Sequence, residues 1–164
     1  MLELGAGAGA NFACYPAGVT VIATEPDEYM LARARKRLSK LPSVDVALKR
    51  ADAQELPFAD ASFDTVIGTL VFCTIPDPMK ALDEAKRVLK PGGKLLLMEH
   101  IRGPDSVRGV TEDIIAPVWK LMAGGCHVNR NTVDLVRKSG FNISSVKSHF
   151  VGLEIVEIVA FKSA

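Results

Sequence analysis

Short apolar runs alternate with longer segments of helical period along this chain. Seven of the runs predict strands, and several are apolar almost throughout, as expected for strands that are covered on both faces. They are residues 1–4, 19–25, 44–50, 63–69, 94–99, 143–149 and 155–161. Because such runs alternate with longer segments of helical period, we expect a parallel sheet that is flanked by helices.

Four segments carry helix signals. In residues 27–38, Asp27 and Glu28 stand at the positive end of the helix dipole, and Met30, Leu31, Ala34 and Leu38 form an apolar stripe. A second helix begins near Asp77 and ends at "KPGG", because proline and glycine do not continue a helix. Residues 110–122 predict a strongly apolar helix, and residues 132–139 predict a short one.

The last two predicted strands are separated only by "VGL" and its neighbours. So short a connection has no room for a crossover helix, and these two strands must form an antiparallel hairpin. The predicted fold class is therefore α/β, with a seven-stranded, mostly parallel sheet, an antiparallel C-terminal hairpin and helices on both faces. A chain of 164 residues suffices for one substantial core and is short for two, so we expect a single domain over residues 1–164.

The charge balance and the cysteines exclude several classes of partner. Twenty Lys and Arg nearly cancel nineteen Asp and Glu, so no global positive field favours nucleic acid. No apolar run approaches the roughly 18 residues of a membrane span. The three cysteines lack the C-x-x-C spacing of zinc sites and the even count of a disulfide framework. We expect a small-molecule partner, no metal site and a reducing, cytoplasmic location.

A glycine-rich loop follows the first predicted strand. Gly5, Gly7 and Gly9 allow a sharp turn and let a ligand lie against bare backbone at a helix start. Glu25 ends the next strand, about 20 residues later, where a carboxylate can accept from both hydroxyls of a ribose. The two features predict an adenosine-containing ligand. Since Gly5-x-Gly7-x-x-Ala10 also satisfies the dinucleotide fingerprint, an NAD-dependent oxidoreductase is an alternative.

The segment "ADAQELPFADASFDTVI" places Asp52 and Ala53 just after the third predicted strand. There a carboxylate can accept from the exocyclic amine of adenine while the neighbouring backbone reads the ring edge. With "LELGAGAG", "ATEPD", "VLKPGGKLLLMEH" and the closing hairpin, nearly the whole sequence resembles the class I S-adenosylmethionine-dependent methyltransferases. The resemblance implies a Rossmann-like fold, S-adenosylmethionine as cofactor and S-adenosylhomocysteine as product. It also implies helices ahead of the glycine loop, which we expect to be missing here.

The same resemblance implies a cofactor-binding role for residues of four segments. The first motif would cradle the methionine part and the ribose, the acid of the second strand would bind the ribose hydroxyls, and the third segment would bind adenine. The end of the fourth strand would pass under the sulfonium. The implied residues are Glu3, Gly5, Ala6, Gly7 and Gly9, then Glu25 and Pro26, then Asp52 and Ala53, and finally Thr69, Leu70 and Val71.

Within that family, "MEH" and "APVWKLMAGGCHVNRNT" look like the methyltransferase-like thiol S-methyltransferases, and are also similar to bacterial phospholipid or quinone methyltransferases. The implied function is methyl transfer to a small, lipophilic acceptor such as a thiol. The alternatives are a quinone or phospholipid headgroup methyltransferase and a truncated cofactor-binding module without turnover. His100, at the end of the fifth strand, is the candidate catalytic residue. Peripheral membrane contact and self-association are left open.

Overall fold

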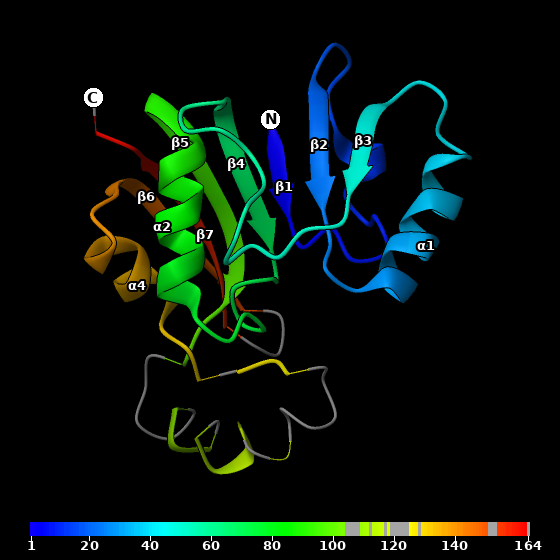
Figure 1. The fold of residues 1–164 in the computed structure, drawn as a ribbon. Helices are drawn as coiled ribbons and strands as arrows, with labels where there is room; N and C mark the ends of the chain where they lie inside the picture. Colours follow the sequence, from blue (N-terminus) through cyan, green and yellow to red (C-terminus); the bar gives the residue numbers. More distant parts are fainter. Residues whose placement is uncertain are drawn as a thin grey trace.

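The computed structural model describes residues 1–103, 109–111, 113–116, 118, 125–127, 129–150 and 154–163. Within them, seven strands form one sheet in the order β3-β2-β1-β4-β5-β7-β6 (Figure 1). The strands are β1 (Leu2–Leu4), β2 (Thr20–Thr24), β3 (Asp45–Lys49), β4 (Phe63–Thr69), β5 (Leu89–His100), β6 (Asn142–Phe150) and β7 (Glu154–Phe161). Strand β7 is antiparallel to β5 and β6, and the other neighbouring pairs are parallel. The predicted sheet and hairpin are confirmed.

The helices begin where capping side chains occur in the sequence. The named helices are α1 (Glu28–Leu38), α2 (Pro78–Val88), α4 (Thr132–Lys138) and the short 3-10 helix η1 (Phe12–Cys14). Asp27 accepts from Met30 N at 2.8 Å and Asp77 accepts from Lys80 N at 3.0 Å, so both residues are N-caps. None of the helices in the described part of the chain is long and apolar enough to cross a membrane.

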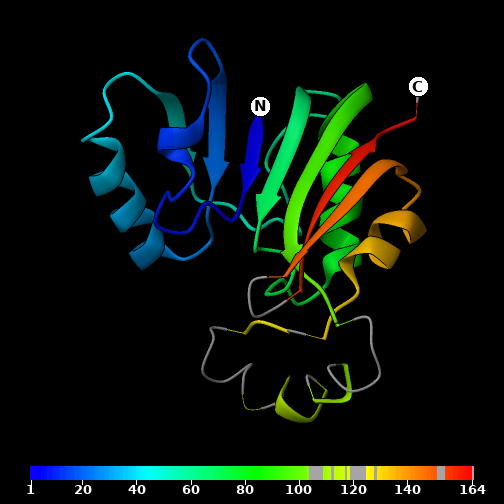
Figure 2. The same ribbon diagram turned by 180° about the vertical axis from the view of Figure 1, so that it is seen from behind.

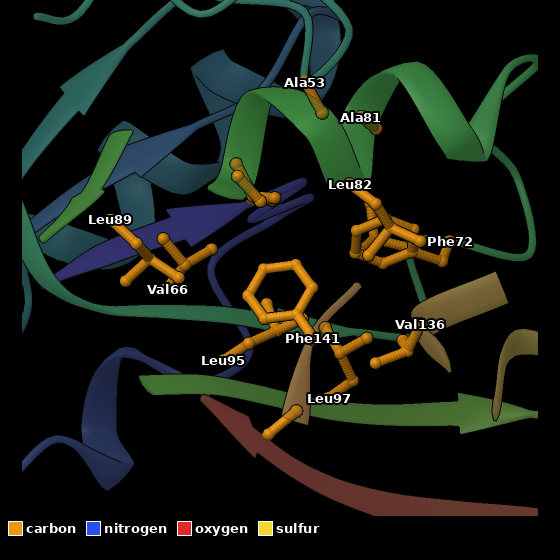
Figure 3. Packing of buried hydrophobic residues seen from close by; sticks show 14 of the residues in the cluster. Ala53, Val66, Phe72, Ala81, Leu82, Leu89, Leu95, Leu97, Val136 and Phe141 are labelled. Atoms are coloured by element: carbon orange, nitrogen blue, oxygen red, sulfur yellow. The ribbon is translucent and has the colours of Figure 1, made fainter. Parts of the chain in front are cut away.

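Helices lie on both faces of the sheet, as predicted. Helix α2 lies over β5 and its neighbours, with α4 beside it against β6 at the edge of the sheet, and Figure 2 shows α2 behind the sheet. There Phe72, Leu82 and Phe141 pack with Leu95 and Leu97 of β5 in the larger core (Figure 3). Helix α1 packs on the opposite face at the other end of the sheet, in a core that joins Ala34 and Leu38 to apolar residues of β2 and β3 (Val21, Ala23, Val46 and Leu48).

Three details differ from the expectations. Strand β5 begins at Leu89 rather than at residue 94, because Leu89 pairs with Phe63 ahead of an irregularity in the β4–β5 register. Met30 is 37% exposed and lines a pocket instead of joining the core. The predicted helix 110–122 is helical at residues 109–111, 113–116 and 118. Its residues 112, 117 and 119–122 lie outside the described residues.

Candidate functional site

A pocket of about 770 Å³ opens at the carboxyl ends of the central parallel strands. From β1 the strand order runs to β2 and β3 on one side and to β4 and β5 on the other. Open α/β sheets bind ligands in the crevice at such a point of reversed strand order. The walls come from the glycine loop, the start of α1, the loop after β3 and the segment after β4. Eight of the predicted site residues line the pocket: Gly5, Gly7, Glu25, Pro26, Asp52, Ala53, Leu70 and Val71.

The glycines of the loop have different tasks. Gly5 has φ +61°, and an added Cβ would lie 2.1 Å from Cγ2 of Val71, so this glycine permits close packing against the segment after β4. Gly9, with φ +78°, approaches the ring of Phe12 in the same manner. Gly7 has φ +53° and nothing within 4 Å of an added Cβ. Its backbone is therefore bare where it lines the pocket.

Glu25 joins the glycine loop to α1. Its Oε2 accepts from Gly7 N at 2.8 Å, and its Oε1 accepts from Asp27 N at 3.0 Å. The residue is buried apart from the surface that lines the pocket. Since each carboxylate oxygen accepts more than one hydrogen bond, both oxygens can still accept from a ligand with two neighbouring hydroxyls.

The loop after β3 is ordered by Gln54, which the sequence reasoning missed. Asp52 Oδ1 accepts from Gln54 N at 2.8 Å, and Gln54 Nε2 donates to both oxygens of Asp52 at 3.1 Å. The other end of the amide accepts from Asp77 N at 2.9 Å. Gln54 therefore ties Asp52 to the N-cap of α2 and holds its carboxylate at the pocket.

A second polar group joins Glu3 to Thr69, two predicted residues that do not line the large pocket. Asn11 Nδ2 donates to Glu3 Oε1 at 2.8 Å and to Thr69 Oγ1 at 3.1 Å. Glu3 is buried, and this burial raises the pKa of its carboxyl. The Tyr15 hydroxyl interacts with the same carboxyl and lowers its pKa against the effect of burial.

The segment that follows β4 is held from two sides. Leu70 has φ +52°, a left-handed conformation that costs a non-glycine residue about 1–2 kcal/mol. Buried Glu99 accepts from Val71 N and Phe72 N, both at 2.9 Å, and also from Cys73 N at 3.2 Å.

Arg130 supports the same segment by donating to Phe72 O and, at 2.7 Å, to Ile75 O. Burial raises the pKa of Glu99 to about 7, although the three backbone N–H groups act in the opposite direction. The sequence reasoning missed these roles of Glu99 and Arg130, because their partners lie far away along the chain.

His100 lies outside the lining of the large pocket. Its Nδ1 is 3.7 Å from Cys126 Sγ, next to the end of β5. The ring is partly buried. A catalytic role for His100 therefore stays a prediction.

Residues 2–97 match the protein family described as "Methyltransferase domain", which covers the glycine loop and the strands that surround the pocket. The chain belongs to this methyltransferase domain family. It is 37% identical over 148 residues to thiol S-methyltransferase TMT1B of Rattus norvegicus, a match that covers 87% of this chain and 59% of the relative. It is 40% identical over 105 residues to demethylmenaquinone methyltransferase of Clavibacter sepedonicus, covering 63% of this chain and 42% of that relative.

A solved structure of a SAM-dependent methyltransferase from Methanosarcina mazei has the same fold. The TM-score is 0.81 at 18% identity, and the match covers 99% of this chain and 91% of that chain. At this identity the likeness establishes the class I methyltransferase fold alone. The chain spans only about half of the length of the two curated relatives named above.

Proposed function

We propose that this methyltransferase domain binds S-adenosylmethionine in the large pocket and transfers its methyl group to a small, lipophilic acceptor, with thiols as the first class. The observation that carries the proposal is Glu25, whose carboxylate bridges the glycine loop and α1 beside bare Gly7. A buried acid fixed in this way suits the two neighbouring hydroxyls of a ribose.

The residues present fit the cofactor. Gly7 offers bare backbone, and Asp52 offers a carboxylate for the adenine amine. Leu70 and Val71 supply an apolar floor where the sulfonium would lie. When bound, the cofactor supplies an already activated methyl group. The chain then has to align the acceptor and exclude water.

The apolar lining of the pocket and the chemistry of thiols support the proposed acceptor class. Leu70, Val71, Ile75, Tyr29 and Met30 give the pocket apolar lining that suits a lipophilic acceptor. A thiol has an unperturbed pKa of about 8.5, so a few per cent is thiolate at neutral pH and little or no general base is required. The thiol S-methyltransferase relative supports this class, and the demethylmenaquinone methyltransferase relative makes a quinone the second candidate.

The test is turnover with a set of acceptors. The protein is incubated with S-adenosylmethionine and small thiols, demethylated quinones or phospholipid headgroups, and mass spectrometry follows the methylated product together with S-adenosylhomocysteine. We expect a methyl thioether with the wild-type protein and with Glu28→Gln, an exposed acid that pairs with Arg35. We expect a large loss with Glu25→Ala.

Other outcomes select the alternatives. Methylation of a quinone alone would replace the acceptor class, and calorimetric binding of S-adenosylmethionine without any turnover would select a cofactor-binding module. Tighter binding of NAD than of S-adenosylhomocysteine would overturn the proposal. The cytoplasmic location, the single domain and self-association stay predictions.

A further inference from the structure

Three side chains that can ligate a metal meet beside the segment after β4. Cys73 lies in that segment, His100 ends β5, and Cys126 precedes α4. The two sulfur atoms and a ring nitrogen of His100 all lie within 4.8 Å of one another. Cys126 Sγ is 3.7 Å from His100 Nδ1. A short motif in the sequence could not predict this cluster, because the fold brings the three residues together from separate parts of the chain.

One separation among the three ligand atoms matches that between ligands on a tetrahedral metal ion. With zinc–sulfur and zinc–nitrogen bonds of about 2.3 and 2.1 Å, tetrahedral angles put neighbouring ligand atoms roughly 3.5–3.8 Å apart. The observed 3.7 Å between Cys126 Sγ and His100 Nδ1 falls in this range. The remaining separations are at most 4.8 Å.

The cysteine ligands are buried and their backbone is fixed. Cys73 is 1% exposed and Cys126 is 6% exposed. The N–H of Cys73 donates to Glu99 Oε2 at 3.2 Å. Its carbonyl accepts from His127 N at 2.8 Å and lies 3.1 Å from His127 Nδ1. His127 thereby joins the Cys126 segment to Cys73, which holds two of the three ligands in place before any ion binds.

The surrounding charges are balanced for a divalent ion. Two thiolates would neutralise the charge of the metal ion. The two nearby charged side chains have opposite signs: Arg130 interacts electrostatically with both cysteines, and Glu99 interacts with Cys73. A buried site with no net charge avoids the large desolvation cost of an isolated ion.

We propose that Cys73, His100 and Cys126 form a binding site for a thiophilic divalent cation of the zinc class. The described residues supply three ligands, which leaves one tetrahedral position for a water molecule or another donor. On binding, the two thiols lose their protons to solvent and each sulfur forms a bond to the ion, with no change of oxidation state. His100 then acts as a ligand rather than as a proton acceptor. This inference does not rest on the proposed methyl transfer.

The test uses Co²⁺ as a spectroscopic probe of the reduced protein. We expect one Co²⁺ per chain, with sulfur-to-cobalt charge-transfer bands and the intense visible bands of a tetrahedral site, and we expect Zn²⁺ to displace it. The Cys126→Ser and His100→Gln variants should bind at least about 100-fold more weakly, because the loss of a ligand exceeds the 10–100-fold effect of losing an outer partner. The Cys14→Ser variant, which changes an exposed cysteine, should bind like the wild type.

Two results would overturn the proposal. One is Co²⁺ binding of equal strength in the wild type and in Cys126→Ser and His100→Gln, with circular dichroism showing that all three are folded. The other is a reduced wild-type protein that takes up no metal and instead forms a Cys73–Cys126 disulfide on mild oxidation. Neither result depends on an assay of methyl transfer, so failure of this proposal is distinguishable from failure of the proposed function.

Discussion

The two sides of the large pocket are built in different ways. On the side of Asp52 and Glu25, two of the three contacts are short along the chain: Gln54 lies two residues from Asp52 and Asp27 two residues from Glu25, whereas Gly7 lies 18 residues from Glu25. On the other side, the segment after β4 is ordered by Glu99 and Arg130, which are separated from their partners by 26 to 58 residues. The first side combines contacts that are close in sequence with one across β1 and β2, whereas the second depends entirely on contacts that are distant in sequence.

The largest effect should come from removing Glu99. Glu99→Ala leaves three buried backbone N–H groups without an acceptor, and we expect the free energy of unfolding to fall by about 3–5 kcal/mol. Denaturant unfolding measures the change. Glu28→Ala, which removes an exposed carboxylate, should cost less than about 1 kcal/mol. Equal losses of unfolding free energy in the two variants would mean that Glu99 does not stabilise the segment after β4.

The glycine loop offers a matched pair of substitutions. Gly5→Ala strains a positive φ and places a methyl group on Val71, so we expect a loss of about 2–4 kcal/mol in the free energy of unfolding. Gly7→Ala meets the backbone strain alone, in open space, and should cost about 1–2 kcal/mol. Thermal or denaturant unfolding separates them. If Gly7→Ala proved the more damaging to stability, the assigned roles of the two glycines would be wrong.

Glu25 should affect ligand affinity more than stability. Glu25→Ala removes the acceptors proposed for the ribose, and binding of S-adenosylhomocysteine should weaken by about 1–3 kcal/mol. Isothermal titration calorimetry gives the affinity, and Glu28→Gln is the control because it changes a neighbouring acid outside the pocket. An unchanged affinity in Glu25→Ala would remove the ribose assignment.

The smallest effect concerns a contact that supports the loop after β3. Glu84 accepts from Leu56 N and pairs with Arg87, which holds the pKa of the Glu84 carboxyl below its usual value. A lowered pKa stabilises the fold above the ordinary value of 4.5, and this contribution disappears as the pH falls through the folded-state pKa. Glu84→Gln should therefore cost about 1 kcal/mol near neutral pH and progressively less in acid.

The measurement is urea unfolding of the wild type and of Glu84→Gln at a series of pH values from neutral to acid. The control is Asp83→Asn, which changes an exposed acid on the same helix. A Glu84→Gln difference that stayed constant into acid would contradict the ion pair.

The sequence predicted what local patterns determine. Short apolar runs predicted all seven strands, with residues 63–69 placed as observed, and Asp27 and Asp77 predicted the starts of α1 and α2 to within a residue. Eight of the site residues that the sequence predicted line one pocket in the structure. The clamp by Glu99 and Arg130 and the meeting of Cys73, His100 and Cys126 could not be predicted, because each depends on side chains from different strands and loops. Met30 was misplaced because helical period does not distinguish a core from a pocket wall.

The most direct test of the account is a crystal structure of the protein with S-adenosylhomocysteine. The account predicts both ribose hydroxyls at hydrogen-bond distance from the carboxylate of Glu25, with the methionine part against the backbone of Gly7 and adenine beside Asp52. A nucleoside bound with its ribose away from Glu25, or bound outside this pocket, would contradict it.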